Sequence, residues 1–350
     1  MKKITALLAS LCLCFSLWFP APALAAESQS IPSYTVTPNT IYGKGEIIEA
    51  GSAMLRDLWM DVYEPLETPP EMPEPRPAVI FTHGGAFHRG DPRHTYHEGG
   101  AQDTSPGDYC RKLASRGYVC FAIAYRLATE NPRPSRLGYE DSDLNEESVT
   151  ILFDQVNKIR SGMVDEEGNP LDPLDPENLE DIAFLHRAVL SAAEDLRLAF
   201  RHICRHSGEY HIDPERVVLG GFSAGAITSL NVAHGMHEPV AGVFLLSGAN
   251  VGFDILNTVT DSSYTPPILM FQGQNDLEAA FVAIPDLLQH YEDVGVPYKF
   301  AWVPAFGHFY PAGATSLSGD GSRISVEERI VQFLEETVGE NRDKYPRRVR

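Results

Sequence analysis

Short apolar runs alternate with amphipathic stretches along the 350-residue chain. Runs that are apolar almost throughout predict strands buried on both faces of a sheet, and they lie at 78–82, 118–125 and 217–219. Further strands are expected at 240–246, 268–272 and 298–303. Apolar positions with helical spacing predict amphipathic helices at 109–116, 182–206, 279–294 and 325–338. Strands that alternate with helices form parallel sheets, so the pattern predicts one doubly wound α/β domain with a mostly parallel sheet.

Two segments depart from this alternation. Residues 41–48 and 55–63 precede the first buried strand, and the alternating polarity of the second run predicts an antiparallel β-hairpin. Residues 129–180 are rich in proline and acidic residues, and 149–159 within them are expected to form one amphipathic helix. A structureless loop of that length is uncommon, so we expect an insertion that crosses the sheet. The pattern leaves open whether this insertion is a lid or a solvated decoration without a catalytic role.

The first residues have the pattern of a bacterial export signal. Two lysines precede an apolar run over 4–19, and Ala23-Leu24-Ala25 satisfies the small-x-small cleavage rule. We therefore expect a signal peptide over 1–25, cleavage after Ala25, and a mature domain over 26–350 that is periplasmic or secreted. An uncleaved anchor fits less well, because the run is short for a bilayer span. No other stretch is long and apolar enough to span a membrane, so no stable membrane insertion is expected.

The net charge and the cysteine spacing argue against two classes of function, nucleic-acid binding and metal binding by cysteines. The formal net charge of −20 argues against a nucleic-acid partner, because an acidic surface repels phosphates. Beyond the expected signal peptide the cysteines are Cys110, Cys120 and Cys204. No Cys-x-x-Cys spacing occurs among them, so no metal site is expected. An oxidising compartment would permit one disulfide and one buried thiol, but the sequence does not pair them.

A candidate nucleophile stands at the end of the apolar run 217–219. The sequence Gly221-Phe222-Ser223-Ala224-Gly225 follows this run and leads into an alanine-rich segment, which is the pattern of a nucleophile elbow. In such a turn the serine occupies a strained apex, and glycines two residues to either side leave room for it. The pentapeptide alone is a weak signal, because ordinary strand-to-helix turns also use small residues.

A serine nucleophile needs a base, and the base needs an acid that orients it. Asp276 follows the strand expected at 268–272, so it should lie at the carboxyl edge of the sheet, where open α/β folds build their sites. The alternative is that Asp276 only caps the next helix, and Asp254 and Asp261 are weaker candidates for the acid. His308 follows the last strand, in a loop that can reach both partners.

A glycine-rich loop follows the strand at 78–82. In His83-Gly84-Gly85-Ala86 bulky side chains are absent, so the N–H groups of Gly84, Gly85 and Ala86 can approach a substrate oxygen. Together with the N–H of Ala224 they form a candidate oxyanion hole. His83 is expected to fix this loop rather than to act as a base. Three more histidines lie in the loop that follows, near the expected mouth of the site, and no role is assigned to them: His88, His94 and His97.

These motifs, with Ser223, Asp276 and His308 in that chain order, resemble the α/β-hydrolase superfamily and, within it, the esterase/lipase group related to hormone-sensitive lipase. The resemblance runs from about Pro77 to the final helix. Further matching motifs are Tyr125-Arg126-Leu127-Ala128, Ala193-Glu194-Asp195, Ile212-Asp213-Pro214-Glu215-Arg216-Val217 and Gly307-His308-Phe309. The resemblance implies the α/β-hydrolase fold, a triad of Ser223, Asp276 and His308, and an oxyanion hole that includes Gly85, Ala86 and Ala224. The insertion at 129–180 is unlike the compact members of the group, which leaves the substrate open.

The function implied by this resemblance is an exported serine carboxylic-ester hydrolase that works through an acyl-enzyme and needs no metal or cofactor. The expected substrate is a small-molecule or polysaccharide-linked ester. The acyl group, the alcohol and the oligomeric state are not predicted. Two alternatives remain, a serine peptidase with the same fold and triad, and a non-catalytic binding module, which typically lacks the serine or the histidine.

Overall fold

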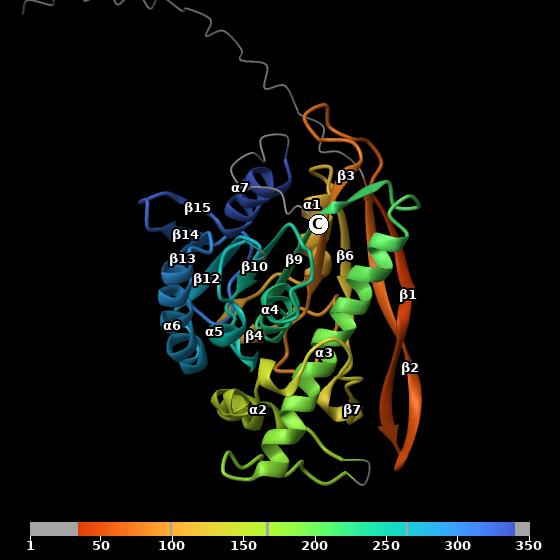
Figure 1. Ribbon diagram of the computed structural model, residues 1–350, viewed down its shortest axis with the longest axis vertical. Coiled ribbons are helices and arrows are strands. Elements are labelled where there is room, and N and C mark those ends of the chain that lie inside the picture. The colour runs from red at the N-terminus through yellow and green to blue at the C-terminus, as the bar shows by residue number, and fades with distance from the viewer. Residues whose placement is uncertain (1–33, 99, 166–167, 264, 340–350) are drawn as a thin grey trace, which may run out of the picture. The chain divides into compact units, whose positions relative to one another are not determined.

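The structure, a computed structural model, describes residues 34–98, 100–165, 168–263 and 265–339. The expected signal peptide over 1–25 lies outside the described residues. In the described part of the chain eleven strands form one large sheet (Figure 1). Their order across the sheet is β15 (Arg323–Ser325), β14 (Thr315–Ser318), β13 (Tyr298–Gly307), β12 (Ile268–Asn275), β10 (Gly242–Leu246), β9 (Ile212–Phe222), β3 (Arg76–Thr82), β6 (Val119–Ile123), β2 (Ser52–Pro65), β1 (Tyr34–Glu49) and β7 (Pro132–Arg133).

The centre of the sheet, from β6 across to β13, is parallel. Its strands are apolar on both sides because helices cover both faces, as the continuous apolar runs predicted. In β3, Ala78 and Ile80 enter one hydrophobic cluster, whereas Val79 and Phe81 enter a second cluster on the opposite face. Burying one such side chain contributes about 1.5–3 kcal/mol, so these two clusters hold the sheet between its helices.

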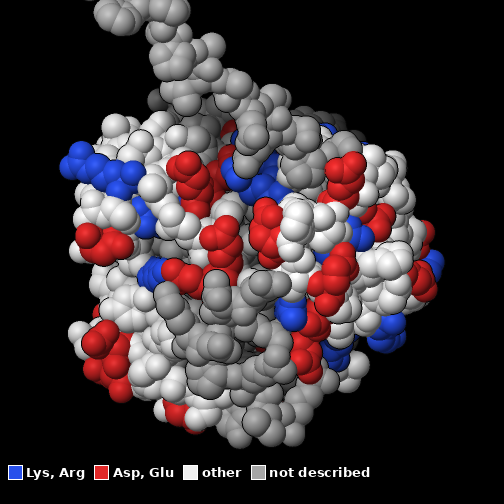
Figure 2. All heavy atoms as spheres, turned by 90° about the horizontal axis from the view of Figure 1, so that it is seen from above, with Lys and Arg blue, Asp and Glu red and all other residues white. Residues whose placement is uncertain are grey.

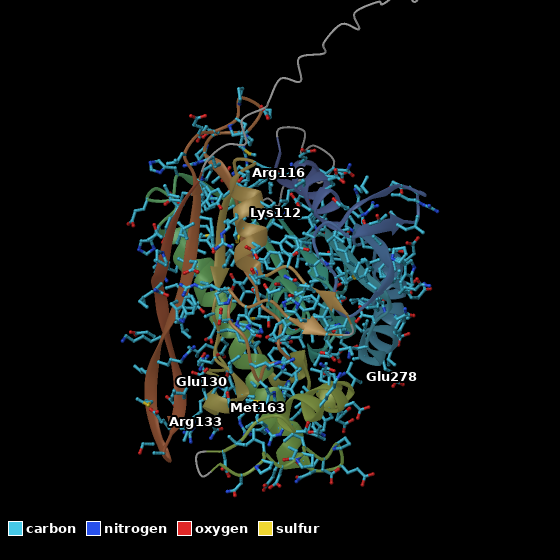
Figure 3. The ribbon with its side chains drawn as sticks, turned by 180° about the vertical axis from the view of Figure 1, so that it is seen from behind. Lys112, Arg116, Glu130, Arg133, Met163 and Glu278 are labelled. Carbon is cyan, nitrogen blue, oxygen red and sulfur yellow. A yellow bond between two sulfur atoms is a disulfide. The ribbon has the colours of Figure 1, made fainter. Side chains whose placement is uncertain are left out.

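Helices from different parts of the chain supply the two covers (Figure 1). One face is packed by α3 (Leu179–Arg205), α4 (Ala224–Leu230) and α6 (Glu278–Val294), and the other by α1 (Pro106–Ala114) and α7 (Val326–Val338). Lys112 of α1 and Arg116, just beyond its end, are labelled in Figure 3. Each lies 2.7 Å from a carboxylate oxygen of Glu327 at the start of α7, which links α1 to α7. A mostly parallel sheet with this strand order and two helical layers is the α/β-hydrolase fold, as predicted.

The ends of the helices are set by capping residues, so they differ from the ends expected from the apolar periodicity. Helix α1 begins before the expected residue 109, because the Ser105 hydroxyl accepts the N–H of Asp108 and Pro106 occupies the first turn. Helix α6 ends where Gly295 adopts φ 74°, a left-handed conformation that favours glycine. The predicted N-terminal hairpin is present as β1 and β2, and both strands extend beyond their expected ends.

The strands β14 and β15 were not predicted. They are short, and they extend the sheet in antiparallel fashion beyond β13. Their sequences show no sustained apolar alternation, so the usual strand signal is missing. Buried Arg329 of α7 holds them in place by donating from Nε to the Ser316 hydroxyl at 2.8 Å and from Nη2 to the Ser316 and Ser322 carbonyl groups.

Where the sequence predicts a single helix at 149–159, the insertion has two consecutive helices. A 3₁₀ helix, η3 (Glu146–Leu152), runs directly into the α-helix α2 (Phe153–Arg160). The single-helix prediction is therefore wrong for its first turn, where the β-branched run Val149-Thr150-Ile151 disfavours regular α-helix. The buried side chains of Val149, Phe153 and Val156 pack in one cluster with Leu185 of α3, so the insertion is part of the folded body.

Arg126 and Asp195, from two motifs that carried the family resemblance, form a buried ion pair. Arg126 Nη2 lies 2.7 Å from Asp195 Oδ1, and the backbone N–H of Arg126 donates to Asp195 Oδ2 at 2.8 Å. The remaining donors of the guanidinium bind the carbonyl groups of Glu46, Arg133 and Ser191. This network connects the end of β6 to α3 and to the edge of the sheet.

Two of the three described cysteines are joined. A disulfide between Cys110 of α1 and Cys120 of β6 links the helix to the strand beneath it, a pairing that the sequence left open. The Sγ atom of Cys204 lies 3.9 Å from the Pro214 carbonyl oxygen.

Acidic and basic side chains are interspersed on the face drawn in Figure 2 and do not gather into one basic surface. Among the described residues, no helix is long and apolar enough to cross a membrane.

Candidate active site

Ser223 lies at the apex of a sharp turn between β9 and α4. Its backbone has φ 55° and ψ −118°, and its N–H donates to the Leu246 carbonyl at 2.8 Å. A Cβ atom at Gly221 would lie 2.1 Å from the Gly225 oxygen, and one at Gly225 would lie 2.1 Å from the Thr82 oxygen. Only glycine fits at either position, which is the geometry expected for a nucleophile elbow.

The fold brings the three residues of the predicted triad into one hydrogen-bonded chain. His308 Nε2 lies 2.8 Å from Ser223 Oγ, and His308 Nδ1 lies 2.6 Å from Asp276 Oδ1. Ser223 follows β9, Asp276 follows β12 and His308 follows β13, so all three stand at the carboxyl edge of the parallel strands. In this arrangement His308 can take the Ser223 proton while Asp276 holds the imidazole in place.

Asp276 is anchored by four donors. Its Oδ2 accepts the Ser247 hydroxyl at 2.5 Å and the Gly273 N–H at 2.9 Å, and its Oδ1 accepts the Leu277 N–H at 2.8 Å in addition to His308. Burial alone would raise the pKa of Asp276, but the hydrogen bonds from His308, Ser247 and Leu277 outweigh it and hold this pKa below the usual value. The carboxylate is therefore ionised and fixed in direction. Helix α6 begins at Glu278 with Leu277 as its N-cap residue, so Asp276 does not occupy the capping position of that helix.

Ser247 and Tyr310 belong to this network and were not singled out from the sequence. The Tyr310 hydroxyl lies 3.0 Å from Ser247 Oγ, which in turn donates to Asp276. Ser247 is the first residue after β10, so its position after a buried strand was the available signal. Tyr310 follows Gly307-His308-Phe309, and nothing in its sequence position marks it for this contact.

The weaker acid candidates do not join the triad. The Asp254 side chain accepts N–H groups of Asn257, at the start of the short helix α5 (Ile255–Thr258). Asp261 Oδ1 accepts the Ser263 N–H at 2.6 Å in a surface turn. Both carboxylates satisfy local backbone donors, as Asp residues in turns commonly do.

The loop that carries the predicted oxyanion hole has an unusual backbone. Gly85, Ala86 and Phe87 have φ values of 115°, 50° and 61°. Ala86 and Ala224 line the same cavity as Ser223, whereas Gly84 and Gly85 are not among the described residues that line it. A Cβ atom at Gly84 would lie 3.1 Å from Ser223 Cβ, and one at Gly85 would lie 2.0 Å from the Arg89 oxygen. Gly84 therefore allows close packing against Ser223, and Gly85 allows close approach of the Arg89 backbone. The oxyanion hole itself stays a prediction, with Ala86 and Ala224 lining the same cavity as Ser223.

The His83 side chain is hydrogen-bonded to the backbone of this loop. Its Nδ1 lies 2.7 Å from the Gly84 oxygen, and its ring stacks on Tyr125 with centroids 4.2 Å apart. Burial lowers the pKa of His83 to about 4, so the ring is neutral and donates its Nδ1 proton to the carbonyl. This contact is the structural role expected for His83.

The candidate triad opens into a cavity of about 520 Å³. One wall is the insertion, through residues 150–155, 157 and 158 together with Pro176. A second wall is the start of α6, including Glu278, which is labelled in Figure 3, and Val282. The floor holds Ser223, His308 and residues 247–249. The insertion thus borders the candidate site and does not lie away from it as a separate decoration.

Comparison with known proteins agrees with the fold. Residues 180–285 match the model of the phospholipase/carboxylesterase family. Among curated proteins, no relative matches the sequence. Among solved structures, esterase Est2 of the planctomycete Thermogutta terrifontis in its native form is 15% identical with a TM-score of 0.49, covering 88% of this chain and 92% of that one. The same organism's esterase 2 phosphorylated by paraoxon is 16% identical with a TM-score of 0.48, covering 87% and 93%.

The fold assignment rests on the strand order and the two helical layers, because the similarity to these solved structures is low. The family match spans the elbow and the strand that leads to Asp276, and it stops before His308. It supports an ester hydrolase, whereas the finer resemblance to the group of hormone-sensitive lipase stays a prediction.

Proposed function

We propose that the protein is an exported serine hydrolase that cleaves carboxylic esters through an acyl-enzyme. The observation that carries this proposal is the hydrogen-bonded chain from Ser223 through His308 to Asp276, which opens into a cavity of about 520 Å³. The match of residues 180–285 to the phospholipase/carboxylesterase family supports an ester as the substrate.

Acylation begins when Ser223 Oγ attacks the ester carbonyl carbon and His308 Nε2 takes the hydroxyl proton. The imidazolium that forms is stabilised by Asp276, whose carboxylate is ionised and 2.6 Å away. The carbonyl oxygen becomes an oxyanion, and we assign the N–H groups of Ala86 and Ala224, two residues that line the cavity, as its donors. Removing one donor of this kind typically costs about 2.7–4 kcal/mol of transition-state stabilisation.

Collapse of the tetrahedral intermediate breaks the bond to the alcohol, and His308 Nε2 returns its proton to the leaving oxygen. The acyl group is then held on Ser223 Oγ. Water enters, His308 removes one of its protons, and the hydroxide attacks the acyl carbon. In a second collapse the bond from the acyl carbon to Ser223 Oγ breaks, and His308 Nε2 returns its proton to that oxygen. The carboxylic acid is released, and the Ser223 hydroxyl and the neutral imidazole are restored.

The cavity sets the size of the substrate. Its walls are formed largely by apolar side chains such as Leu152, Phe153 and Ile227, with Asp154 and Glu278 among the charged lining residues. Such a cavity holds a small ester or the ester-bearing end of a larger chain, including an acylated polysaccharide. Comparison of aryl esters of increasing acyl length with an acetylated glycan and an aminoacyl amide would separate these substrates from those of a peptidase.

The pattern at residues 1–25 and the disulfide between Cys110 and Cys120 both support export. Disulfides persist mainly in oxidising compartments, whereas cytosolic thiols are kept reduced. Expression in a bacterial host, fractionation and N-terminal sequencing would test this part of the proposal. Recovery of a full-length chain that retains Met1 in the cytosol would contradict it.

The central test is Ser223→Ala. This variant should lose ester hydrolysis, and wild-type Ser223 should be labelled by a fluorophosphonate, which a non-catalytic binding module would not allow. Ser229→Ala is a matched control, because Ser229 is buried in α4, the helix that follows Ser223, and its Oγ donates to the Gly225 carbonyl at 2.9 Å. Hydrolysis above background by Ser223→Ala would overturn the mechanism.

A further inference from the structure

Two consecutive non-glycine residues have left-handed backbone conformations in the loop that carries the predicted oxyanion hole. Ala86 has φ 50° and Phe87 has φ 61°, immediately after Gly85 at φ 115°. Such a conformation is strained for a non-glycine residue, so it persists only where neighbouring groups hold it. We call residues 85–87 the 85–87 turn.

The imidazole and the backbone N–H of His88 are both hydrogen-bonded to this turn. His88 Nδ1 lies 2.9 Å from the Ala86 oxygen, and the backbone N–H of His88 donates to the Gly85 carbonyl at 3.0 Å. The His88 side chain is only 1% exposed. Among the described residues, no other side chain is hydrogen-bonded to a carbonyl group of the 85–87 turn.

A second contact fixes which nitrogen of His88 carries the proton. Arg160 Nη1 lies 3.4 Å from His88 Nε2, and a guanidinium can only donate. Nε2 must therefore accept, which leaves the proton on Nδ1, where it is donated to the Ala86 carbonyl. Burial, with a smaller effect from Arg160, lowers the pKa of His88 to about 4, so the ring is neutral at pH 7.

Arg160 is the last residue of α2, the helix that forms part of the cavity wall. Its Nε donates to the Asp172 carbonyl at 2.8 Å, and its guanidinium carbon lies 5.8 Å from the centre of the Phe184 ring. The His88 ring meets the same phenyl ring edge-on, with centroids 6.2 Å apart. His88 thus connects the 85–87 turn to the insertion.

We propose that His88 is a positioning residue for the proposed ester hydrolysis. It holds the 85–87 turn in the conformation that presents the Ala86 N–H to the oxyanion, and it is itself oriented by Arg160 of the cavity wall. The inference rests on the proposed function, because it assigns a purpose to a turn of that same site.

His88 acts through the turn and not on the substrate. It is not among the described residues that line the cavity, and it has no hydrogen bond to the triad in that part of the chain. Loss of its hydrogen bond should therefore weaken stabilisation of the transition state and leave binding of the substrate in its ground state nearly unchanged.

Kinetics of two variants test this prediction. His88→Leu removes the donor, and kcat should fall roughly 10- to 100-fold with little change in KM. His88→Asn keeps an N–H donor near the position of Nδ1 and should recover most of the lost kcat. His97→Leu is the matched control and should behave as wild type, because His97 is exposed in the short strand β4 (His97–Glu98) nine residues further along the chain. Wild-type kcat in His88→Leu, or an equal loss in His88→Asn, would overturn the proposal.

The proton position can be measured without any substitution. In wild-type protein labelled with ¹⁵N-histidine, NMR at pH 7 should show a neutral His88 ring protonated at Nδ1. A ring protonated at Nε2, or at both nitrogens, would contradict the assignment even if every variant failed to fold.

Fluorophosphonate labelling separates this proposal from the proposed function. Phosphonylation of Ser223 places an oxygen in the same oxyanion hole but needs no ester substrate. If wild-type protein is labelled yet cleaves no ester, the proposed function fails and His88→Leu should still be labelled more slowly. Equal labelling rates would overturn the role of His88, and absence of labelling in wild type would overturn both proposals.

Arg160→Leu should slow labelling several-fold, and an unchanged rate would overturn the link to α2.

Discussion

The hydroxyl oxygen of Ser247 lies 2.5 Å from Asp276 Oδ2, the carboxylate oxygen that His308 does not contact. Asp276, the proposed acid of the triad, is therefore held at both oxygens, by His308 on one side and by Ser247 with the Gly273 N–H on the other. The Tyr310 hydroxyl, 3.0 Å from Ser247 Oγ, completes the network. Such a chain of bonds keeps the carboxylate aimed at the imidazole, as the proposed mechanism requires when His308 gains and loses a proton.

Ser247→Ala should lower kcat about tenfold without a matching change in KM. Hydrogen bonds to charged groups contribute about 1.5–3 kcal/mol, and here the Gly273 N–H remains as a second donor to the same oxygen. Tyr310→Phe should have a smaller effect, because Tyr310 contacts Ser247 and not the carboxylate. Steady-state kinetics of the two variants would check this order, and a larger loss in Tyr310→Phe would contradict it.

Asp276→Asn should reduce kcat by about 10⁴-fold while the fold is retained, because the amide no longer stabilises the imidazolium or its correct tautomer. Asp254→Asn is the matched control, since the Asp254 side chain bonds to Asn257 in a short helix away from His308. Circular dichroism and kinetics of both variants would measure this difference. Comparable losses in both variants would show that Asp276 is not the acid of the triad.

Stability should fall on acidification because buried His83 and His88 must remain neutral. Burial lowers the pKa of each to about 4 in the folded protein, compared with 6.5 for an unperturbed histidine. The unfolded chain therefore binds more protons between these values, so the free energy of unfolding falls as pH drops from about 6.5 to 4. The loss is at most about 3 kcal/mol for each histidine.

Asp103 has the opposite effect on the free energy of unfolding below about pH 6. Burial raises its folded-state pKa to about 6, so the folded protein binds this proton before the unfolded chain does. Urea denaturation of wild type and His88→Asn at several pH values isolates the His88 contribution, since Asp103 is common to both. The advantage of wild type over His88→Asn should shrink as the pH is lowered. A constant difference between the two would show that His88 does not titrate in this way.

Arg126→Leu should destabilise the protein by about 3–5 kcal/mol, because it leaves the Asp195 carboxylate buried without its partner. Removing both charges in Arg126→Leu/Asp195→Leu should cost less than the sum of the single changes. Denaturation of the four proteins in a double-mutant cycle gives the coupling energy. Additive losses would argue against a direct interaction between the two side chains.

Much of the fold was predictable because its central strands are buried on both faces and its helices are amphipathic. The same logic located Ser223, Asp276 and His308, since each follows a strand whose carboxyl end lies at one edge of the sheet. Ser247 also follows such a strand, but its bond to Asp276 depends on the neighbouring β10 and β12 strands, which periodicity does not specify.

Other features depend on conformations that residue type alone does not encode. His88 reaches the carbonyl of Ala86 only because Ala86 and Phe87 have positive φ values, and neither is a residue type that favours them. The strands β14 and β15 depend on the contacts of Arg329 and not on their own apolar pattern. The 3₁₀ segment η3 takes the place of the first turn of the helix that spacing predicted over 149–159.

The contact between Arg160 and His88 has a consequence for how this protein can be changed. The insertion that borders the cavity is a separate stretch of chain from the residues proposed to break the ester bond. In principle, substrate preference could therefore be altered by grafting a foreign insertion. Such a graft would also remove the guanidinium that orients His88. A chimera is therefore expected to turn over even its preferred ester slowly unless the donor segment brings a cation to the same place.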